Sequence, residues 1–378
     1  MRFARYRHLP AGSACAVLLL TLACSAGQGP ILIGLAGPFT DSVGAPMRRA
    51  AELAVEQANR SGGINGRRIE LVIRDDFGDP DSAVTAATAL EAAGVVAVIG
   101  HVYSGTTIAA APVYNDPRDP VVQISPSSTA PEVTGAGDYT FRVCPSDLQY
   151  GAALARFAAE RMGFRHGTIL YLNDPYGRGL RQSFLNSFTD LGGAIDDIDP
   201  YLGGDPDVSA YLDRLSRRGM SQFIFLGGNY PEAEATLRAA ASRKIRIPLL
   251  GGDGLEGLEK AGTLAEGSYI ANGYLANFPS AQNREFVRGY ADRYPGAAPP
   301  SQAAAATYDI LFLLRRVIGQ VGTDRKKIRD GVAAIGLTAP VYDGVTGEIA
   351  FDEQGDVPKQ RVVIGKVRNG QVIAVEGQ

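Results

Sequence analysis

Hydrophobic residues follow two alternating periods along the first half of this chain. Short apolar runs of four to seven residues are typical of buried strands, and apolar residues spaced three and four apart are typical of helices that cover a sheet. The strands are predicted at 31–36, 68–74, 95–100 and 121–124. The helices are predicted between them, at 44–60, 80–93 and 106–114.

The same alternation restarts after Pro145, which predicts a second lobe rather than one long sheet. Helices are predicted at 148–162, 179–191, 208–217, 232–243, 284–294 and 303–318, and strands at 168–172, 222–226 and 247–250. Repeated strand–helix units of this kind indicate an α/β fold with parallel, doubly wound sheets and right-handed crossovers. The chain becomes purely β from Gly347, with a hairpin turned at Asn369-Gly370.

The N-terminal segment has the pattern of an export signal. Three arginines precede an apolar run from Ala14 to Ala23, which is shorter than the ~20 residues of a membrane-spanning helix. The run ends in LTLAC, which resembles a bacterial lipobox, so we expect a signal peptide over 1–23, lipidation of Cys24 and a tether over 24–30. Ordinary cleavage near Ala26 is the alternative.

Composition excludes several classes of protein. The chain has 378 residues, 37 Lys+Arg and 40 Asp+Glu, and this balance lacks the basic excess of a nucleic-acid-binding groove. Three histidines and three cysteines, with no CxxC, argue against a metal site. Once the signal is removed only Cys144 remains, so no intramolecular disulfide can form, and Cys144 is expected to be a buried small hydrophobe.

The segment 252–257 matches the glycine pattern of a dinucleotide-binding loop. The match is disfavoured because Asp253 would place a carboxylate beside the pyrophosphate, and because the segment does not open a first βαβ unit. A glycine-rich turn is the preferred interpretation, with Asp253 exposed at the carboxyl end of a strand. We therefore expect no cofactor. Nor is an enzyme expected, since His101 is better explained as a hydrogen-bonded histidine at a strand terminus than as a catalytic base.

Two hydroxyl-rich loops follow neighbouring strands, at 100–107 and 125–129. Ligands of open α/β sheets bind outside the carboxyl ends of strands, and serine or threonine hydroxyls near helix N-termini suit a carboxylate. Simple helix capping is the open alternative, with Ser104 as an N-cap and Thr129 and Glu132 as a capping box.

Seven segments, in this order, resemble one family over essentially the whole chain after the signal. They are ILIGLAGPFTDSVG, AVEQANRSGGINGRRIELVIRDDFGDP, VVAVIGHVYSGTT, QISPSSTAPEVT, NDPYGRG, GGNYPEAE and GGDGLEG. The chain resembles the type I periplasmic substrate-binding proteins of ABC importers, in the leucine/isoleucine/valine-binding branch. The resemblance implies two Rossmann-like lobes joined by three crossovers, with a ligand cleft between them.

The resemblance also implies a set of binding residues. Ser104, Ser127 and Thr129 are expected to hold the carboxylate of an amino acid on one lobe. On the other lobe, Tyr176 is expected to close over the ligand and Asp253 to pair with its ammonium group, where the branch usually has a glutamate.

Four positions depart from the family pattern. Where the family has a tryptophan beside the side-chain pocket, this chain has Val43, and where the family has an aromatic residue in the segment matching GGNYP, this chain has Asn229. These two differences predict a roomier and more polar pocket. The family's disulfide positions fall on Phe77 and Tyr103, where an aromatic contact is expected to replace the bridge. Tyr103, Asn229 and Val43 are also expected to be ligand-binding residues.

These expectations together describe an exported, lipid-anchored, monomeric solute-binding protein that delivers an amino acid, branched-chain or a related small polar ligand, to an inner-membrane permease. Lobe 1 is expected to comprise 31–146 and 274–354, and lobe 2 to comprise 147–273 and 355–378. Two alternatives remain open: a ligand sensor of the same fold that is not coupled to transport, and a less favoured nicotinamide-dependent enzyme.

Overall fold

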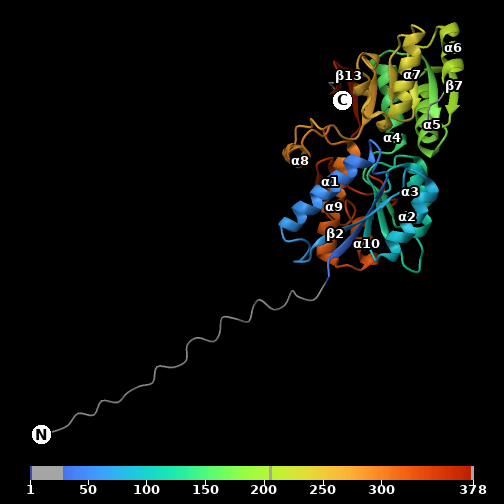
Figure 1. Cartoon of the computed structure of the whole chain (residues 1–378). Coiled ribbons are helices and arrows are strands. Elements are labelled where there is room, and N and C mark those ends of the chain that lie inside the picture. The colour runs from blue at the N-terminus through green and yellow to red at the C-terminus, as the bar shows by residue number, and fades with distance from the viewer. Residues whose placement is uncertain (2–28, 204–206, 376–378) are drawn as a thin grey trace.

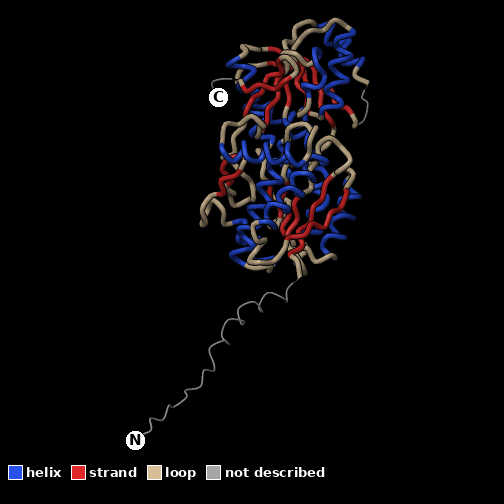
Figure 2. The backbone as a smooth tube through the Cα atoms, turned by 60° about the vertical axis from the view of Figure 1, so that its left-hand side comes forward, coloured by secondary structure: helices blue, strands red, loops and turns tan. Residues whose placement is uncertain are grey.

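The computed structural model describes residues 1, 29–203 and 207–375, which form two lobes stacked end to end (Figure 1). Each lobe has a central sheet with helices on both faces (Figure 2). The predicted signal peptide and Cys24 lie outside the described residues.

The first lobe contains a parallel five-stranded sheet in the order β2-β1-β3-β4-β5. Its strands are β1 (Ile31–Gly37), β2 (Ile69–Asp75), β3 (Ala97–Ile99), β4 (Val122–Ser125) and β5 (Thr140–Arg142). One face is covered by α2 (Pro80–Ala92) and α3 (Ser104–Tyr114). The other is covered by α1 (Gly44–Arg60), α9 (Gln302–Val321) and α10 (Arg325–Ala333).

The second lobe contains a seven-stranded sheet in the order β14-β13-β10-β9-β8-β6-β7. Its parallel strands are β6 (His166–Leu172), β7 (Ala194–Tyr201), β8 (Ile224–Gly227), β9 (Leu249–Gly251) and β10 (Tyr269–Asn272). The antiparallel strands β13 (Val363–Arg368) and β14 (Gln371–Ala374) form the predicted hairpin, with positive φ at Asn369 and Gly370. The helices are α4 (Asp147–Arg156), α5 (Pro175–Asp190), α6 (Ser209–Arg218) and α7 (Tyr230–Ser242).

The chain passes between the lobes three times. It leaves the first lobe after β5, returns after β10 through α8 (Ala281–Arg293), and leaves again between β12 (Gly347–Ile349) and β13. The short strand β11 (Tyr342–Gly344) pairs with β12 beside the first lobe. The predicted architecture of two α/β lobes with three crossovers is confirmed.

Helix α9 has almost no polar face because most of its residues are buried. It is apolar almost all round because it lies between the sheet and neighbouring helices, and its Asp309 is buried. That carboxylate accepts hydrogen bonds from the backbone N–H groups of Val345 and Thr346, which fixes the β11–β12 connection to the helix. Within the described part of the chain, no helix is both long and apolar enough to cross a membrane.

Candidate functional site

A cavity of about 230 Å³ lies between the two lobes, at the carboxyl ends of strands from both sheets. The loops after β1, β3 and β4 line it from one lobe, and the loops after β6, β8 and β9 line it from the other. Seven of the eight predicted binding residues line this cavity: Val43, Tyr103, Ser104, Ser127, Tyr176, Asn229 and Asp253. The structure thus brings together residues that are far apart in the sequence.

Ser104 is the first residue of α3 and is almost fully buried. Its hydroxyl oxygen accepts a hydrogen bond from the backbone N–H of Ala130, at 3.1 Å, in the neighbouring loop. The N-cap position belongs to Tyr103, so the interpretation of Ser104 as an N-cap is wrong. Because the oxygen is already used as an acceptor, the hydroxyl hydrogen remains available for an acceptor in the cavity.

The loop after β4 places its two predicted residues differently. Ser127 lines the cavity, whereas Thr129 is fully buried behind it and is absent from the lining. The Thr129 hydroxyl has no hydrogen-bond partner, and no side chain caps the short helical turn Pro131–Val133. The predicted capping box is therefore wrong, and in this structure Thr129 does not reach the cavity.

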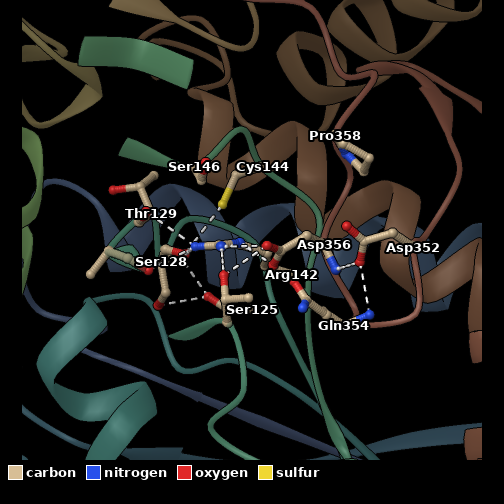
Figure 3. A network of polar contacts seen from close by, with 12 residues as sticks. Ser125, Ser128, Thr129, Arg142, Cys144, Ser146, Asp352, Gln354, Asp356 and Pro358 are labelled. Carbon is tan, nitrogen blue, oxygen red and sulfur yellow. Dashed lines mark hydrogen bonds and ion pairs between the residues drawn. The ribbon is translucent and has the colours of Figure 1, made fainter. Parts of the chain in front are cut away.

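Arg142 holds this loop in place from beneath (Figure 3). Its guanidinium is 1% exposed and donates to the backbone carbonyls of Ser128, Thr129 and Ala130. The same group forms an ion pair with Asp356, which lies in the third crossover. Cys144 packs beside this network and, as predicted, is a buried thiol; burial raises its pKa.

Asp253 faces the hydroxyls from the opposite lobe. It follows β9 in a short 3₁₀ turn, Asp253–Leu255, and only 8% of it is exposed, so the expectation of an exposed carboxylate is wrong. Burial raises its pKa to about 7, although the Tyr176 and Ser127 hydroxyls favour the charged form and act in the opposite direction. Its Oδ1 has no hydrogen-bond partner. The cavity therefore contains a desolvated carboxylate oxygen that a cationic group could satisfy.

Tyr176 is the second residue of α5 and fixes the geometry of this turn. Its hydroxyl accepts the backbone N–H of Gly254 at 3.0 Å. A Cβ atom on residue 254 would lie 2.8 Å from that hydroxyl and 2.5 Å from the Gly228 carbonyl oxygen, so only glycine fits. The glycine-rich segment thus permits close packing of the tyrosine rather than approach of a pyrophosphate.

Gln302, at the start of α9, connects Asp253 to the crossovers. Its side-chain nitrogen donates to Asp253 Oδ2 at 3.4 Å, and its side-chain oxygen accepts from Tyr150 at 2.9 Å. The backbone N–H of Gln302 donates to Glu256, whose pKa desolvation raises to about 8. The carboxyl group at the ligand cavity is therefore hydrogen-bonded to a residue of the other lobe.

The comparisons with known proteins agree with this architecture. The sequence signature described as "Periplasmic binding protein" matches residues 30–371. The chain belongs to the periplasmic binding protein family. The predicted family is thereby confirmed for this periplasmic binding protein.

The similar proteins cover nearly the whole chain. A leucine-, isoleucine-, valine-, threonine- and alanine-binding protein of Pseudomonas aeruginosa is 31% identical over 86% of this chain and 87% of its own. A substrate-binding protein of an ABC transporter from Desulfitobacterium hafniense, solved in complex with leucine, has a TM-score of 0.79 and 30% identity, covering 92% of this chain and 100% of that one. A branched-chain amino acid transporter substrate-binding protein of Streptococcus pneumoniae, in complex with isoleucine, has a TM-score of 0.82 and 28% identity, covering 91% and 98%.

Tyr103 of this periplasmic binding protein has a partner that the sequence did not predict. Its hydroxyl donates to Asp41 Oδ2 at 2.6 Å, while Asp41 Oδ1 accepts the backbone N–H groups of Val43 and Gly44 at the start of α1. Phe77 is 69% exposed and makes no ring contact with Tyr103. The expected aromatic replacement for the disulfide is therefore wrong, and a hydrogen bond to a carboxylate fixes Tyr103 instead.

His101 is a buried structural residue, as predicted. Its Nδ1 lies 2.6 Å from Asp76 Oδ2 and its Nε2 lies 3.3 Å from the Tyr114 hydroxyl. Its backbone carbonyl accepts the hydroxyl of Ser125 from the next loop. The side chain is thus occupied below the cavity, and its backbone helps to join the two hydroxyl-rich loops.

Four acidic residues that the sequence analysis missed also line the cavity: Asp41, Asp174, Glu232 and Glu256. Asp174 and Glu232 could have been suspected because each lies in a segment, NDPYG or GGNYPE, that also supplies a predicted residue. Asp41 and Glu256 had the same signal, since Asp41 lies in the segment that supplies Val43 and Glu256 in the segment that supplies Asp253. No group of three or more His, Cys, Asp or Glu among the described residues is arranged to hold a metal ion.

Proposed function

We propose that this protein is the solute-binding component of an ABC importer and that it binds an α-amino acid, branched-chain or small and polar, in the cavity between its lobes. The observation that carries this proposal is the pairing of Ser104 and Ser127 on one lobe with the unsatisfied Asp253 oxygen on the other. A zwitterionic ligand presents one group to each.

The carboxylate end of the cavity has hydrogen-bond donors without any basic side chain. Ser104 supplies a hydroxyl hydrogen, and the first turn of α3 supplies N–H groups that have no acceptor within the helix. The positive end of the helix dipole favours an anion here. Ser127 adds a second hydroxyl from the neighbouring loop.

The ammonium end consists of Asp253 and Tyr176. A ligand ammonium beside Asp253 Oδ1 would offset the desolvation of that carboxylate, because an opposite charge stabilises the ionised form. Since the two ends belong to different lobes, a ligand that contacts both favours the closed arrangement over an open one.

The volume of the cavity limits the size of the ligand. About 230 Å³ is below the roughly 300–1,000 Å³ of sites for drug-sized molecules. A small amino acid fits this space, whereas a dinucleotide does not. The size and the carboxylates both speak against the alternative of a nicotinamide-dependent enzyme.

Several finer points belong to the same proposal. We place the lobe boundaries at 31–146 with 274–354 and at 147–273 with 355–378, and we expect a monomer.

We also propose export by the signal peptide 1–23 and anchoring through lipidated Cys24. Metabolic labelling with an alkynyl fatty acid tests the anchor: label in the parent and none in Cys24→Ser supports it, and equal label in both refutes it.

The function itself is tested by binding. In a thermal-shift screen of amino acids, amides and small carboxylates, a ligand at about 1,000 times its Kd adds about 4 kcal/mol of stability. We expect shifts from α-amino acids and none from NADH. Deletion of the gene for this protein distinguishes import from sensing: uptake of the ligand is lost if the protein serves an importer, and is unaffected if it is a sensor.

A further inference from the structure

Helix α5 of the second lobe meets the first lobe at Gly179. The helix contacts both α3 and the turn Pro131–Val133, which belong to the first lobe (Figure 1). A Cβ atom on residue 179 would lie 2.5 Å from Pro131 Cδ, 3.4 Å from Pro131 Cγ and 3.1 Å from Asp147 Oδ2. Since carbon atoms pack at about 3.5–4.0 Å, a side chain there would need about 1 Å more space between the lobes.

The first-lobe side of this contact cannot give way locally. Pro131 Cδ belongs to the proline ring, so it cannot rotate aside. The preceding residue, Ala130, is fixed from two directions, because its N–H donates to the Ser104 hydroxyl oxygen and its carbonyl accepts from Arg142. Pro131 is thus part of the rigid loop that carries Ser127.

The second-lobe side is fixed as well. Gly177, in the first turn of α5, packs closely on its own lobe: a Cβ atom there would lie 2.1 Å from the Leu172 carbonyl oxygen and 2.7 Å from that of Gly227. The N-terminal end of α5 therefore lies directly on the ends of β6 and β8 and cannot move closer to them. A side chain at residue 179 could be accommodated only by opening of the cleft.

Gly179 is close to the binding residues without lining the cavity. Tyr176 lies three residues earlier in α5, so the two residues are on the same face of the helix. Tyr176 lines the cavity, whereas Gly179 is absent from its lining. The contact between Gly179 and Pro131 therefore determines how near Tyr176 comes to Ser127 on the other lobe.

We propose that Gly179 is a positioning residue for ligand binding: its contact with Pro131 sets how far the cleft closes, and hence whether Tyr176 reaches a ligand held by the first lobe. This inference rests on the proposed function, because it takes the position of the ligand from it. It gives the last glycine of the segment NDPYGRG a role that does not depend on which amino acid is bound.

Gly179→Ala tests this inference. The probes are the two amino acids that the parent binds most tightly among L-leucine, L-isoleucine, L-valine, L-threonine and L-alanine. In calorimetric titrations of the intact protein, Kd should rise about tenfold or more, because overpacking of a fixed contact destabilises the closed state. The factor should be the same for both probes, since residue 179 does not touch the ligand. In stopped-flow measurements koff should carry the change, and kon should change by less than about threefold.

Stability and a matched variant separate positioning from a defect in folding. Ligand-free Gly179→Ala should unfold at a denaturant concentration no lower than that of the parent, because opening removes the overlap and alanine favours a helix more than glycine does. Gly319→Ala is the control, since it makes the same substitution in α9, where no atom lies within 4 Å of the added Cβ. It should leave the affinity for both probes unchanged.

Pro131→Ala supplies a rescue. It removes the ring carbons Cγ and Cδ from the contact, so the double variant Gly179→Ala/Pro131→Ala should bind each probe within about threefold of Pro131→Ala alone. Recovery would identify Pro131 as the partner of residue 179, because a general disturbance of α5 would persist in the double variant.

The outcomes separate this inference from the proposed function. Parent-like affinity in Gly179→Ala, or no recovery in the double variant, would overturn the role of the contact and retain the amino acid site. Ligand-free Gly179→Ala that unfolds more easily than the parent, or does not fold, would also overturn it, since the residue would then be structural. Absence of binding by all five amino acids in the parent would remove the proposed function and this inference together.

Discussion

Arg142 and Asp356 are 214 residues apart in the sequence and form an ion pair with 2.7 Å between Nε and Oδ1. Arg142 ends β5, next to the first crossover, and Asp356 lies in the third. Because Arg142 also donates to the carbonyls of the loop after β4, one guanidinium joins two crossovers to a wall of the cavity. The loop that carries Ser127 is therefore held by residues of the hinge.

This relationship predicts a stability effect. Arg142→Gln should lower the free energy of unfolding by about 3–5 kcal/mol, because it removes the ion pair of Asp356 and the donor to three buried carbonyls. Arg118→Gln is the control, since its ion pair with Asp116 is exposed, and its free energy of unfolding should stay that of the parent. Chemical denaturation measures both. A loss in Arg142→Gln no larger than in the control would show that the network does not stabilise the hinge.

The carboxylate end predicts a contrast between two hydroxyls. Ser104→Ala should weaken amino acid binding about tenfold or more, because a hydrogen bond to a charged group contributes ~1.5–3 kcal/mol. Thr129→Val should leave the affinity unchanged, since the Thr129 hydroxyl is behind the cavity wall and has no partner to lose. Titration calorimetry distinguishes them. Equal losses in both variants would mean that Thr129 reaches the ligand in a conformation other than this one.

Tyr176 predicts a kinetic effect. It lines the cavity from the second lobe, and we propose that it covers the ligand only when the cleft closes, so Tyr176→Ala should raise koff more than it lowers kon. Stopped-flow fluorescence gives both constants. An unchanged dissociation rate would place Tyr176 outside the closed site.

The pKa of Asp253 predicts how affinity depends on pH. In the ligand-free protein burial raises this pKa to about 7, and a bound ammonium would lower it because it favours the charged carboxylate. The carboxyl must therefore lose its proton to bind, so affinity should be highest above about pH 7 and fall up to about tenfold per pH unit below it. Binding should release protons over the same range.

Calorimetry in buffers of different ionisation enthalpy measures that proton release. Glu256→Gln is a necessary control, because Glu256 has a raised pKa of about 8 and lies in the same cavity. The dependence should persist in Glu256→Gln and disappear in Asp253→Asn. An affinity that stays constant from about pH 5.5 to 8.5 would exclude Asp253 as the ammonium partner.

The spacing of apolar residues predicted helices and strands that have one buried face. It did not predict an element in which charged residues interrupt that spacing. Helix α1 was predicted at its observed bounds because its apolar residues repeat at helical spacing and are buried. Strand β7, with the sequence AIDDIDPY, was not predicted, since three aspartates and a proline mask its period. These aspartates are possible there because β7 is an edge strand, where Arg214 pairs with Asp197 and Asp199.

Some residues of the site could likewise be predicted from the sequence, and others could not. Ser104 and Asp253 could be predicted because each belongs to a segment with its own recognisable pattern. The position of Thr129 could not, since a rotation of the loop after β4 decides which hydroxyl faces the cavity, and that rotation is set by Arg142 and Asp356 from far along the chain.

The most direct test of the central claim, that the cavity binds an α-amino acid through Asp253, is a calorimetric titration of the parent and Asp253→Asn. The ligands are leucine and lysine, each beside the matching acid without an α-amino group, 4-methylpentanoate and 6-aminohexanoate. We predict that Asp253→Asn loses ~2–5 kcal/mol of binding free energy for the amino acid that the parent binds more tightly, or roughly thirty- to several-thousand-fold in Kd. Its affinity for the matching acid should remain that of the parent. Equal affinity of parent and variant for the amino acid would contradict the claim.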